Sequence, residues 1–272
     1  MAGIAGILNP GKKNLVDIML KKMNHRGWAW SEIIEDQHTT IGMNGLKIQE
    51  QALLVLKNEG LAKDGCVPGR FAQAQSTTKG FTLTRDAIGA SPLYYGWTKE
   101  GEFCFASEVK ALLLATTDIH ELPPGSQMKD EKIEPYFKLE ELTQVSDSPE
   151  IIASTLRKKI QESIEKSICR ENIGSWLSGG LDSSVMAALA SKKVKKLFTF
   201  AAGLPGAPDL DYARQMASFI KSDHHEVIVT LDEVLSILPE VIYHLESFDA
   251  LLIRSSILNF IVARYASHFV PE

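Results

Sequence analysis

The sequence has few cysteines and no long apolar run. Its three cysteines, Cys66, Cys104 and Cys169, form neither a Cys-x-x-Cys pair nor a zinc spacing with histidine. Reduced thiols that pack in the interior are therefore expected, rather than disulfides or metal ligands. Apolar runs such as residues 52–56 and 111–115 are far shorter than the roughly 18 residues that a membrane helix needs. These absences predict a chain without disulfides or membrane spans.

The sequence also lacks an excess of positive charge. It carries 29 Lys and Arg residues against 34 Asp and Glu residues, a net charge of −5. This balance provides no bulk electrostatic attraction to nucleic acid or anionic lipid. The first residues, MAGIAGILNPGKK, lack the basic start and long apolar region of a secretory signal. We therefore expect a soluble cytoplasmic protein with no nucleic-acid or membrane partner.

What the sequence does contain is 272 residues, enough for one large or two small domains. The first half is dominated by short strand-like runs that Gly, Pro and Asn interrupt, and it contains two helical patterns, at 14–23 and 108–115. The strand-like runs are residues 3–8, 39–43, 53–56, 70–75, 81–84, 93–97 and 102–106. Many short strands and few helices predict a sheet-rich, mostly antiparallel first domain over residues 1–143.

The second half alternates strands and helices. A polar stretch at 140–148 is expected to link the halves, and Ser148, Pro149 and Glu150 form a helix start. After that first helix, strands are expected at 173–177, 197–202 and 226–230, and helices at 183–191, 212–220, 231–244 and 254–268. This alternation predicts a parallel, doubly wound α/β domain over residues 148–272.

The most informative segment lies between the first of these strands and the helix after it. Its sequence is Ser178-Gly179-Gly180-Leu181-Asp182-Ser183-Ser184. Paired glycines lack Cβ atoms, so backbone N–H groups can converge on phosphate oxygens. The following helix adds the positive end of its dipole, and the serines add hydroxyl donors. Because a carboxylate faces a phosphate only through a cation, Asp182 is predicted to bind Mg²⁺.

Two common nucleotide motifs are excluded for this segment. No lysine follows the glycines, as a Walker A loop requires. The G-x-G-x-x-G spacing of a dinucleotide fold is also missing. A glycine turn capped by Ser and Asp is the structural alternative to a phosphate loop.

The segment resembles the pyrophosphate-binding loop of the ATP pyrophosphatases, which split ATP between its α and β phosphates and adenylate a substrate. Within that superfamily the chain is most similar to the asparagine synthetases. Their motifs match residues 200–214, the His224-His225-Glu226 triplet and residues 241–256. The likeness covers nearly all of residues 150–270.

This resemblance implies an ATP site, a metal ligand and two catalytic residues. The residues that it places at ATP are Leu177, Ser178, Gly179, Gly180, Leu181, Asp182, Ser183, Ser184, Ala202 and Gly203. Asp182 is also the implied Mg²⁺ ligand. Glu246 and Arg254 are the implied catalytic residues, with Asp249 beside them near the carboxylate substrate and the phosphates. Two structural alternatives stay open: Arg254 pairs with Glu246 or Asp249, and His224 and His225 have a structural role because adjacent strand residues face opposite sides.

The first half resembles the amino domain of the same family, an N-terminal-nucleophile glutamine amidotransferase. The resemblance implies an αββα domain followed by the α/β ATP-pyrophosphatase domain. Framework segments match at residues 24–27, 85–89, 92–96, 105–112 and 123–125. The chemistry is missing, however, because Ala2 stands where the family has its nucleophilic cysteine and Gly45 where it has a substrate-binding arginine. The family's acidic clamp is deleted between Gln51 and Gly60.

We therefore expect an asparagine-synthase-like ligase that has lost glutaminase activity. ATP, aspartate or a related carboxylate, and ammonia are the expected substrates, and homodimer formation is left open. Leu251, Leu252, Ile257 and Leu258 replace family hydroxyl, Thr and Pro positions, so a β-lactam-synthetase-like ligase is an alternative. The family's G-E-G-x-D-E loop does not occur in the sequence. That absence predicts an incomplete second domain and keeps a non-catalytic nucleotide-binding or partner-binding paralogue as the rival.

Overall fold

The computed structural model describes residues 2–45, 69–77, 80–129, 131–139, 146–168 and 170–270. The chain divides into two compact units, Met1–Gln144 and Val145–Glu272. The division falls inside the polar stretch expected to link two domains. The expectations for Cys66, Cys169 and residues 51–60 lie outside the described residues. No helix in the described part is long and apolar enough to cross a bilayer.

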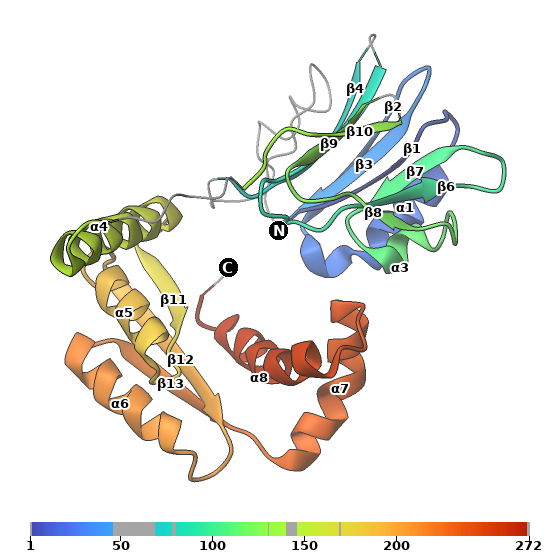
Figure 1. Ribbon diagram of the computed structural model, residues 1–272. Helices are drawn as coiled ribbons and strands as arrows, with labels where there is room; N and C mark the ends of the chain where they lie inside the picture. The colour runs from blue at the N-terminus through green and yellow to red at the C-terminus, as the bar shows by residue number, and fades with distance from the viewer. Residues whose placement is uncertain are drawn as a thin grey trace. The chain divides into compact units, whose positions relative to one another are not determined.

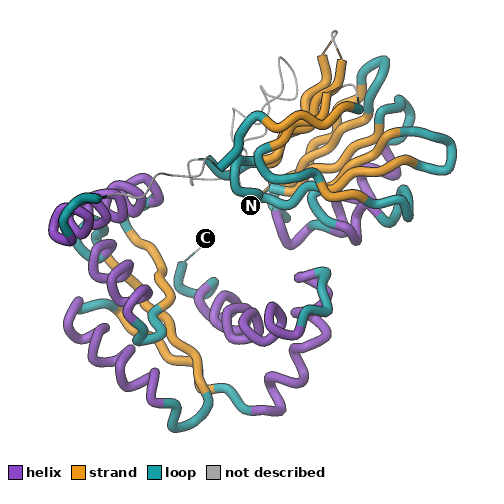
Figure 2. Tube along the Cα trace, in the orientation of Figure 1, coloured by secondary structure: helices purple, strands orange, loops and turns teal. Residues whose placement is uncertain are grey.

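The first unit contains two antiparallel sheets (Figures 1 and 2). The six-stranded sheet has the order β2-β3-β1-β7-β6-β8, and the four-stranded sheet has the order β10-β9-β5-β4. The strands are β1 (Gly3–Ile7), β2 (Trp30–Glu35), β3 (Thr40–Gly45), β4 (Ala72–Thr77), β5 (Gly80–Arg85), β6 (Tyr94–Trp97), β7 (Phe103–Ala106), β8 (His120–Glu121), β9 (Ser126–Lys129) and β10 (Lys132–Pro135). The helical segments in the described residues are α1 (Lys13–Lys22), a 3-10 turn at Asn24–Arg26, and α3 (Val109–Leu112).

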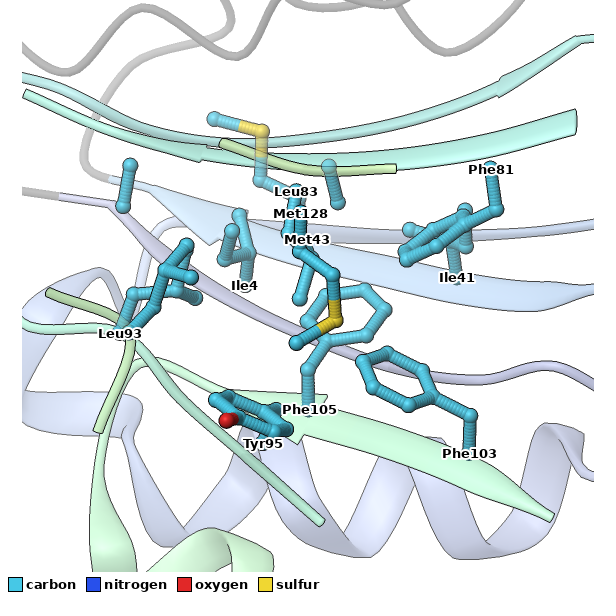
Figure 3. Close-up of a cluster of buried hydrophobic side chains, with 13 residues drawn as sticks. Ile4, Ile41, Met43, Phe81, Leu83, Leu93, Tyr95, Phe103, Phe105 and Met128 are labelled. Atoms are coloured by element: carbon cyan, nitrogen blue, oxygen red, sulfur yellow. The ribbon is translucent and has the colours of Figure 1, made fainter. Parts of the chain in front are cut away.

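The central strands of the six-stranded sheet are buried on both faces. On β1, Ile4 joins the core between the two sheets, whereas Ala5 and Ile7 join the core beneath α1 and α3. On β7, Phe105 joins the core between the two sheets (Figure 3), whereas Cys104 joins the core beneath the helices. This follows from the two-residue period of a strand, which sends successive side chains to opposite faces.

Three of the four expected layers are seen in the described residues of this unit. Both helices pack on the six-stranded sheet, and the four-stranded sheet covers its other face. The helix expected at 108–115 is shorter than predicted, because α3 ends at Leu112 and turns follow it. Cys104 is fully buried, and burial raises the pKa of its thiol to about 12. This cysteine is therefore an unreactive packing residue, as expected.

One buried carboxylate joins two of the framework segments. Glu108 accepts from His25 Nε2 at 2.8 Å and from Arg26 Nη1 at 3.2 Å, and Lys110 Nζ lies 2.6 Å from its other oxygen. Burial alone would raise the pKa of Glu108, but the hydrogen bonds from His25 and Lys110 outweigh it and lower this pKa to about 2. Glu108 thus fastens the start of α3 to the 3-10 turn that follows α1.

The second unit is a three-stranded parallel sheet with helices on both faces (Figure 2). The sheet order is β11-β12-β13. The elements are α4 (Pro149–Ser167), β11 (Asn172–Trp176), α5 (Leu181–Ala190), β12 (Lys196–Gly203), α6 (Pro208–Ile220), β13 (Asp223–Ile228), α7 (Leu231–Leu245) and α8 (Ala250–Ala266). The predicted alternation and parallel pairing are both observed.

Strand β12 sets the layers of the second unit. Its residues Leu197 and Ala201 pack with α4, α5 and α6, whereas Phe200 packs with α8. A separate cluster that includes Val241 and Ile257 joins α7 to α8. The two crossover helices α5 and α6 therefore share one face of the sheet, and α8 covers the other.

Replacing Glu108 with Gln should destabilise the protein by about 3 kcal/mol at pH 7, because Arg26 and Lys110 would stay buried opposite a neutral amide. The folded-state pKa of about 2 lies below the ordinary value of 4.5. The ionised carboxylate therefore stabilises the fold fully above that ordinary value and progressively less as pH falls through it toward 2. The deficit of E108Q should shrink over the same range. Urea unfolding followed by circular dichroism at several pH values measures it.

The exposed Glu100 provides a matched control. E100Q should change the free energy of unfolding by less than about 0.5 kcal/mol at every pH. A deficit of E108Q that stays constant from pH 7 to pH 2 would contradict the assignment of a buried, ionised Glu108.

Candidate functional site

The predicted phosphate loop, residues 177–184, lies at the carboxyl end of a parallel strand. It connects β11 to α5, and the buried Leu177 donates its N–H to the Phe200 carbonyl of β12 at 2.8 Å. Ligands of open α/β sheets bind outside the carboxyl ends of the strands. The fold thus puts this segment at the edge where a ligand is expected.

Hydrogen bonds within the loop hold its shape. Ser178 Oγ and Ser183 Oγ lie 3.0 Å apart, and Ser183 Oγ donates to the Gly180 carbonyl at 3.2 Å. The backbone N–H of Ser178 also donates to Ser183 Oγ at 3.2 Å. Ser178, Gly180 and Asp182 are exposed, so the loop is both preformed and open to solvent.

Gly179 is the residue for which the loop requires glycine. Its φ of +79° is in the left-handed region, which disfavours side chains. A Cβ atom there would also lie 2.6 Å from the Asp209 carbonyl oxygen and 2.8 Å from the Ala213 nitrogen. The loop therefore packs directly against the backbone of α6.

The first turn of α5 can accept an anion. Its N-cap is Gly180, which makes no side-chain cap, so the N–H groups of the first turn keep their capacity to bind a ligand. Asp182 lies in this turn. The described residues contain no group of three or more His, Cys, Asp or Glu side chains that could hold a metal. A metal at Asp182 would need other ligands, which suits Mg²⁺, since this ion commonly takes one or two carboxylates together with phosphates and waters.

Ala202 and Gly203 end the neighbouring strand at the same edge. Ala202 is half-buried and packs on the α8 side, and Gly203 accepts a hydrogen bond from Val229 at 3.0 Å. A Cβ atom on Gly203 would lie 3.2 Å from the Ala207 Cβ. The fold thus brings these two residues and the loop to adjacent strand ends.

Glu246 and Asp249 lie on the connection between α7 and α8, and Arg254 lies near the start of α8. Glu246 ends α7 with a φ of +52°, and Asp249 caps α8 by accepting the Leu252 N–H at 2.7 Å. Arg254 is exposed. In the part of the chain that the structure describes, Arg254 forms no ion pair with Glu246 or Asp249 and no hydrogen bond with the loop. The structural alternative in which Arg254 pairs with Asp249 is thus not observed.

His224 and His225 face opposite sides of β13. His225 packs its ring against Phe269, Phe200 and other aromatic side chains on the α8 face. His224 Nδ1 lies 2.9 Å from Thr199 Oγ1 on the α6 face, and burial lowers the pKa of His224. The two rings cannot bind one metal together. The packing and hydrogen bonds of this pair therefore agree with the structural role that was considered for it.

Sequence reasoning assigned no role to Arg214 and Glu226, which form an ion pair between α6 and β13. Arg214 Nε lies 2.6 Å from Glu226 Oε1, and Arg214 Nη2 donates to Glu226 Oε2 at 2.9 Å. Both residues fall inside motif segments identified in the sequence. The two residues are twelve positions apart in the sequence, and they meet only when α6 packs on β13. The sequence pattern alone therefore did not indicate the contact.

In the first unit, the start of the chain is fastened to its surroundings. Gly3 donates its N–H to Asn44 Oδ1 at 2.9 Å, and the Ala2 carbonyl accepts from Arg26 Nε at 3.1 Å. Beside Asn44, a Cβ atom on Gly45 would lie 2.7 Å from the Trp30 indole nitrogen. The Trp30 ring therefore occupies the space into which a side chain at position 45 would extend.

The sequence matches two known families. Residues 155–271 match the asparagine synthase family, and residues 54–114 match the glutamine amidotransferase domain. A glutamine-hydrolyzing asparagine synthetase of Zea mays is 35% identical over 207 residues, which is 71% of this chain and 35% of the relative. Asparagine synthetase B of Escherichia coli (strain K12) is 32% identical over 213 residues, 71% of this chain and 38% of the relative.

Among solved structures, a glutamine phosphoribosylpyrophosphate amidotransferase from B. subtilis covers 91% of this chain and 94% of its own, with 11% identity and a TM-score of 0.38. That likeness is too weak to carry an argument. In the two sequence relatives the match spans just over a third of their length. By its matches to both families and to these relatives, the chain belongs to the asparagine synthetase family.

Proposed function

We propose that the protein is an ATP-dependent amide ligase that adenylates aspartate or a related carboxylate and uses ammonia as the nitrogen donor. The observation that carries the proposal is the preformed loop at residues 178–184, with its required glycine, at the carboxyl end of a parallel strand. In this proposal residues 1–143 form the amidotransferase-like domain and residues 148–272 form the ATP-pyrophosphatase domain, in the cytoplasm.

The loop would bind the phosphates of ATP, and Ala202 and Gly203 would contact the adenosine. The substrate carboxylate attacks the α-phosphorus, and the bond to pyrophosphate breaks. Ammonia then attacks the carbonyl carbon of the acyl adenylate, loses a proton to solvent and displaces AMP. The chain's contribution is to orient the reactants and to neutralise phosphate charge with N–H groups. Bound at Asp182 and the phosphates, Mg²⁺ would supply further charge neutralisation.

The choice of ammonia over glutamine is supported by two positions in the first unit. The Ala2 side chain is a methyl group, which has no nucleophilic atom with which to attack an amide. A Cβ atom on Gly45 would lie 2.7 Å from the indole nitrogen of Trp30 and 2.9 Å from two carbons of the same ring. The position therefore has no room for a substrate-binding arginine. We propose that this unit has lost glutamine hydrolysis and keeps only its framework.

The carboxylate substrate is proposed to bind near the start of α8. Glu246 and Arg254 would bind or activate this carboxylate. Leu251 and Leu252 lie exposed near the start of α8, where aliphatic side chains would favour a less polar acid than aspartate. A β-lactam-synthetase-like substrate is therefore retained as the second candidate.

Isotope exchange between ATP and pyrophosphate in the presence of Mg²⁺ and aspartate tests the proposal. The protein should catalyse exchange above background, and D182N should lower the rate by about 10- to 100-fold through lost metal affinity. Asp232 provides a matched control, because it is an exposed carboxylate in the first turn of α7. D232N should exchange like the natural protein. Background exchange together with retained ATP binding would support the non-catalytic rival instead.

Nitrogen donors can be compared directly in the amidation reaction. Ammonium should yield amide product, and glutamine without ammonium should yield neither product nor glutamate. The variant A2C should also release no glutamate, because the Trp30 ring still fills the space beside Gly45. Glutamate release by the natural protein, measured by a coupled dehydrogenase assay, would refute the loss of glutaminase activity.

A further inference from the structure

The phosphate loop rests on the first two turns of α6. A Cβ atom built on Gly179 would lie 2.6 Å from the Asp209 carbonyl oxygen, 2.7 Å from the Tyr212 Cβ and 2.8 Å from the Ala213 nitrogen. The glycine backbone therefore lies so close to α6 that no side chain fits between them. Any shift of α6 along or toward the sheet must therefore move the loop.

Arg214 follows Ala213 on α6 and ties this helix to β13. Its guanidinium contacts both carboxylate oxygens of Glu226, at 2.6 and 2.9 Å, and it also donates to Asp211 on the same helix. Two-point contacts of this kind fix direction as well as distance. The Arg214 side chain is 52% exposed and that of Glu226 is 20% exposed, so the pair is partly screened by solvent.

A buried polar chain lies beside Glu226 in the sheet. His224 Nε2 lies 3.5 Å from Glu226 Oε1, and these two atoms form no hydrogen bond with each other. Its Nδ1 lies 2.9 Å from Thr199 Oγ1, and Thr199 Oγ1 lies 2.7 Å from Ser222 Oγ. Thr199 is completely buried. These hydrogen bonds fix the His224 ring and stop short of Glu226, so the carboxylate of Glu226 is oriented by its contacts with Arg214 on α6.

We propose that Arg214 and Glu226 are positioning residues that set the conformation of the phosphate loop through α6, without contacting the nucleotide. The inference rests on the proposed function for its ligand, but its mechanical part concerns this chain alone. The ion pair fixes α6 on β13, α6 supports Gly179, and Gly179 determines where the N–H groups of the loop point.

Amide hydrogen exchange of the protein without ligand tests the mechanical part. In E226Q and in Arg214→Met the amides of residues 177–184 should exchange about three- to fivefold faster, the range expected for a partly exposed ion pair. Arg214→Lys keeps the charge but loses the two-point contact, so its loop should exchange at an intermediate rate. Helix α8, on the opposite face of β12, is the internal reference and should not change.

Asp223→Asn is the matched control. Asp223 lies on the same strand and pairs with Lys196 at 2.7 Å instead of with α6, so its loss should leave loop exchange unchanged. Loop exchange in E226Q equal to that of the natural protein would overturn the inference. Faster exchange of α8 and the loop to the same extent would also overturn it, because it would indicate general destabilisation.

Calorimetric titration with Mg-ATP and with adenosine completes the test. The affinity of E226Q for Mg-ATP should fall about three- to fivefold, whereas its affinity for adenosine, which has no phosphates, should not change. Equal losses for both ligands would contradict a role in positioning the phosphate loop. If the natural protein binds neither ligand, the proposed function fails, and the exchange measurement still decides the role of Arg214 and Glu226.

Discussion

Both units are built around strands that must bury both of their faces. On β1 and β7, large and small apolar side chains alternate between a sheet–sheet core and a sheet–helix core. On β12, alternate residues divide between the α5–α6 face and the α8 face. A strand of this kind cannot slip by one residue without exchanging its two cores. In the second unit the parallel pairing of β11, β12 and β13 adds a second constraint, because it puts their carboxyl ends at one edge, where the loop at 178–184 lies.

Much of the fold could be predicted from the sequence, because periodic burial leaves a direct trace in it. The helix expected at 231–244 is α7 at Leu231–Leu245, and the strand expected at 197–202 is β12 at Lys196–Gly203. The strand expected at 226–230 is observed earlier, at Asp223–Ile228, because pairing with β12 overrides the polar character of His224 and its neighbours. Strands β2, β8, β9 and β10 were missed: they are short, or their side chains are largely exposed or polar.

The candidate site was predictable where it depends on local sequence and not where it depends on long-range packing. Paired glycines before a helical pattern predicted a phosphate loop, and the position of this segment between β11 and α5 agrees with that prediction. The pairing of Arg214 with Glu226 left no comparable pattern, since it exists only when α6 lies on β13. For Glu246 and Arg254, likeness to a family supplied a role, and the structure places Glu246 at the end of α7 and Arg254 near the start of α8.

The close approach of Gly45 and Trp30 makes these two positions of the first unit depend on each other. Gly45 also lies against Gly27, whose own Cβ position would collide with the backbone of Gly45. A side chain introduced at position 45 would have to displace a half-buried indole that packs on the sheet core, and it would be destabilising until Trp30 changed as well. A substitution of Trp30 made first would leave a gap in that core. Neither order is free of cost, so a side chain at position 45 requires coordinated changes at two positions.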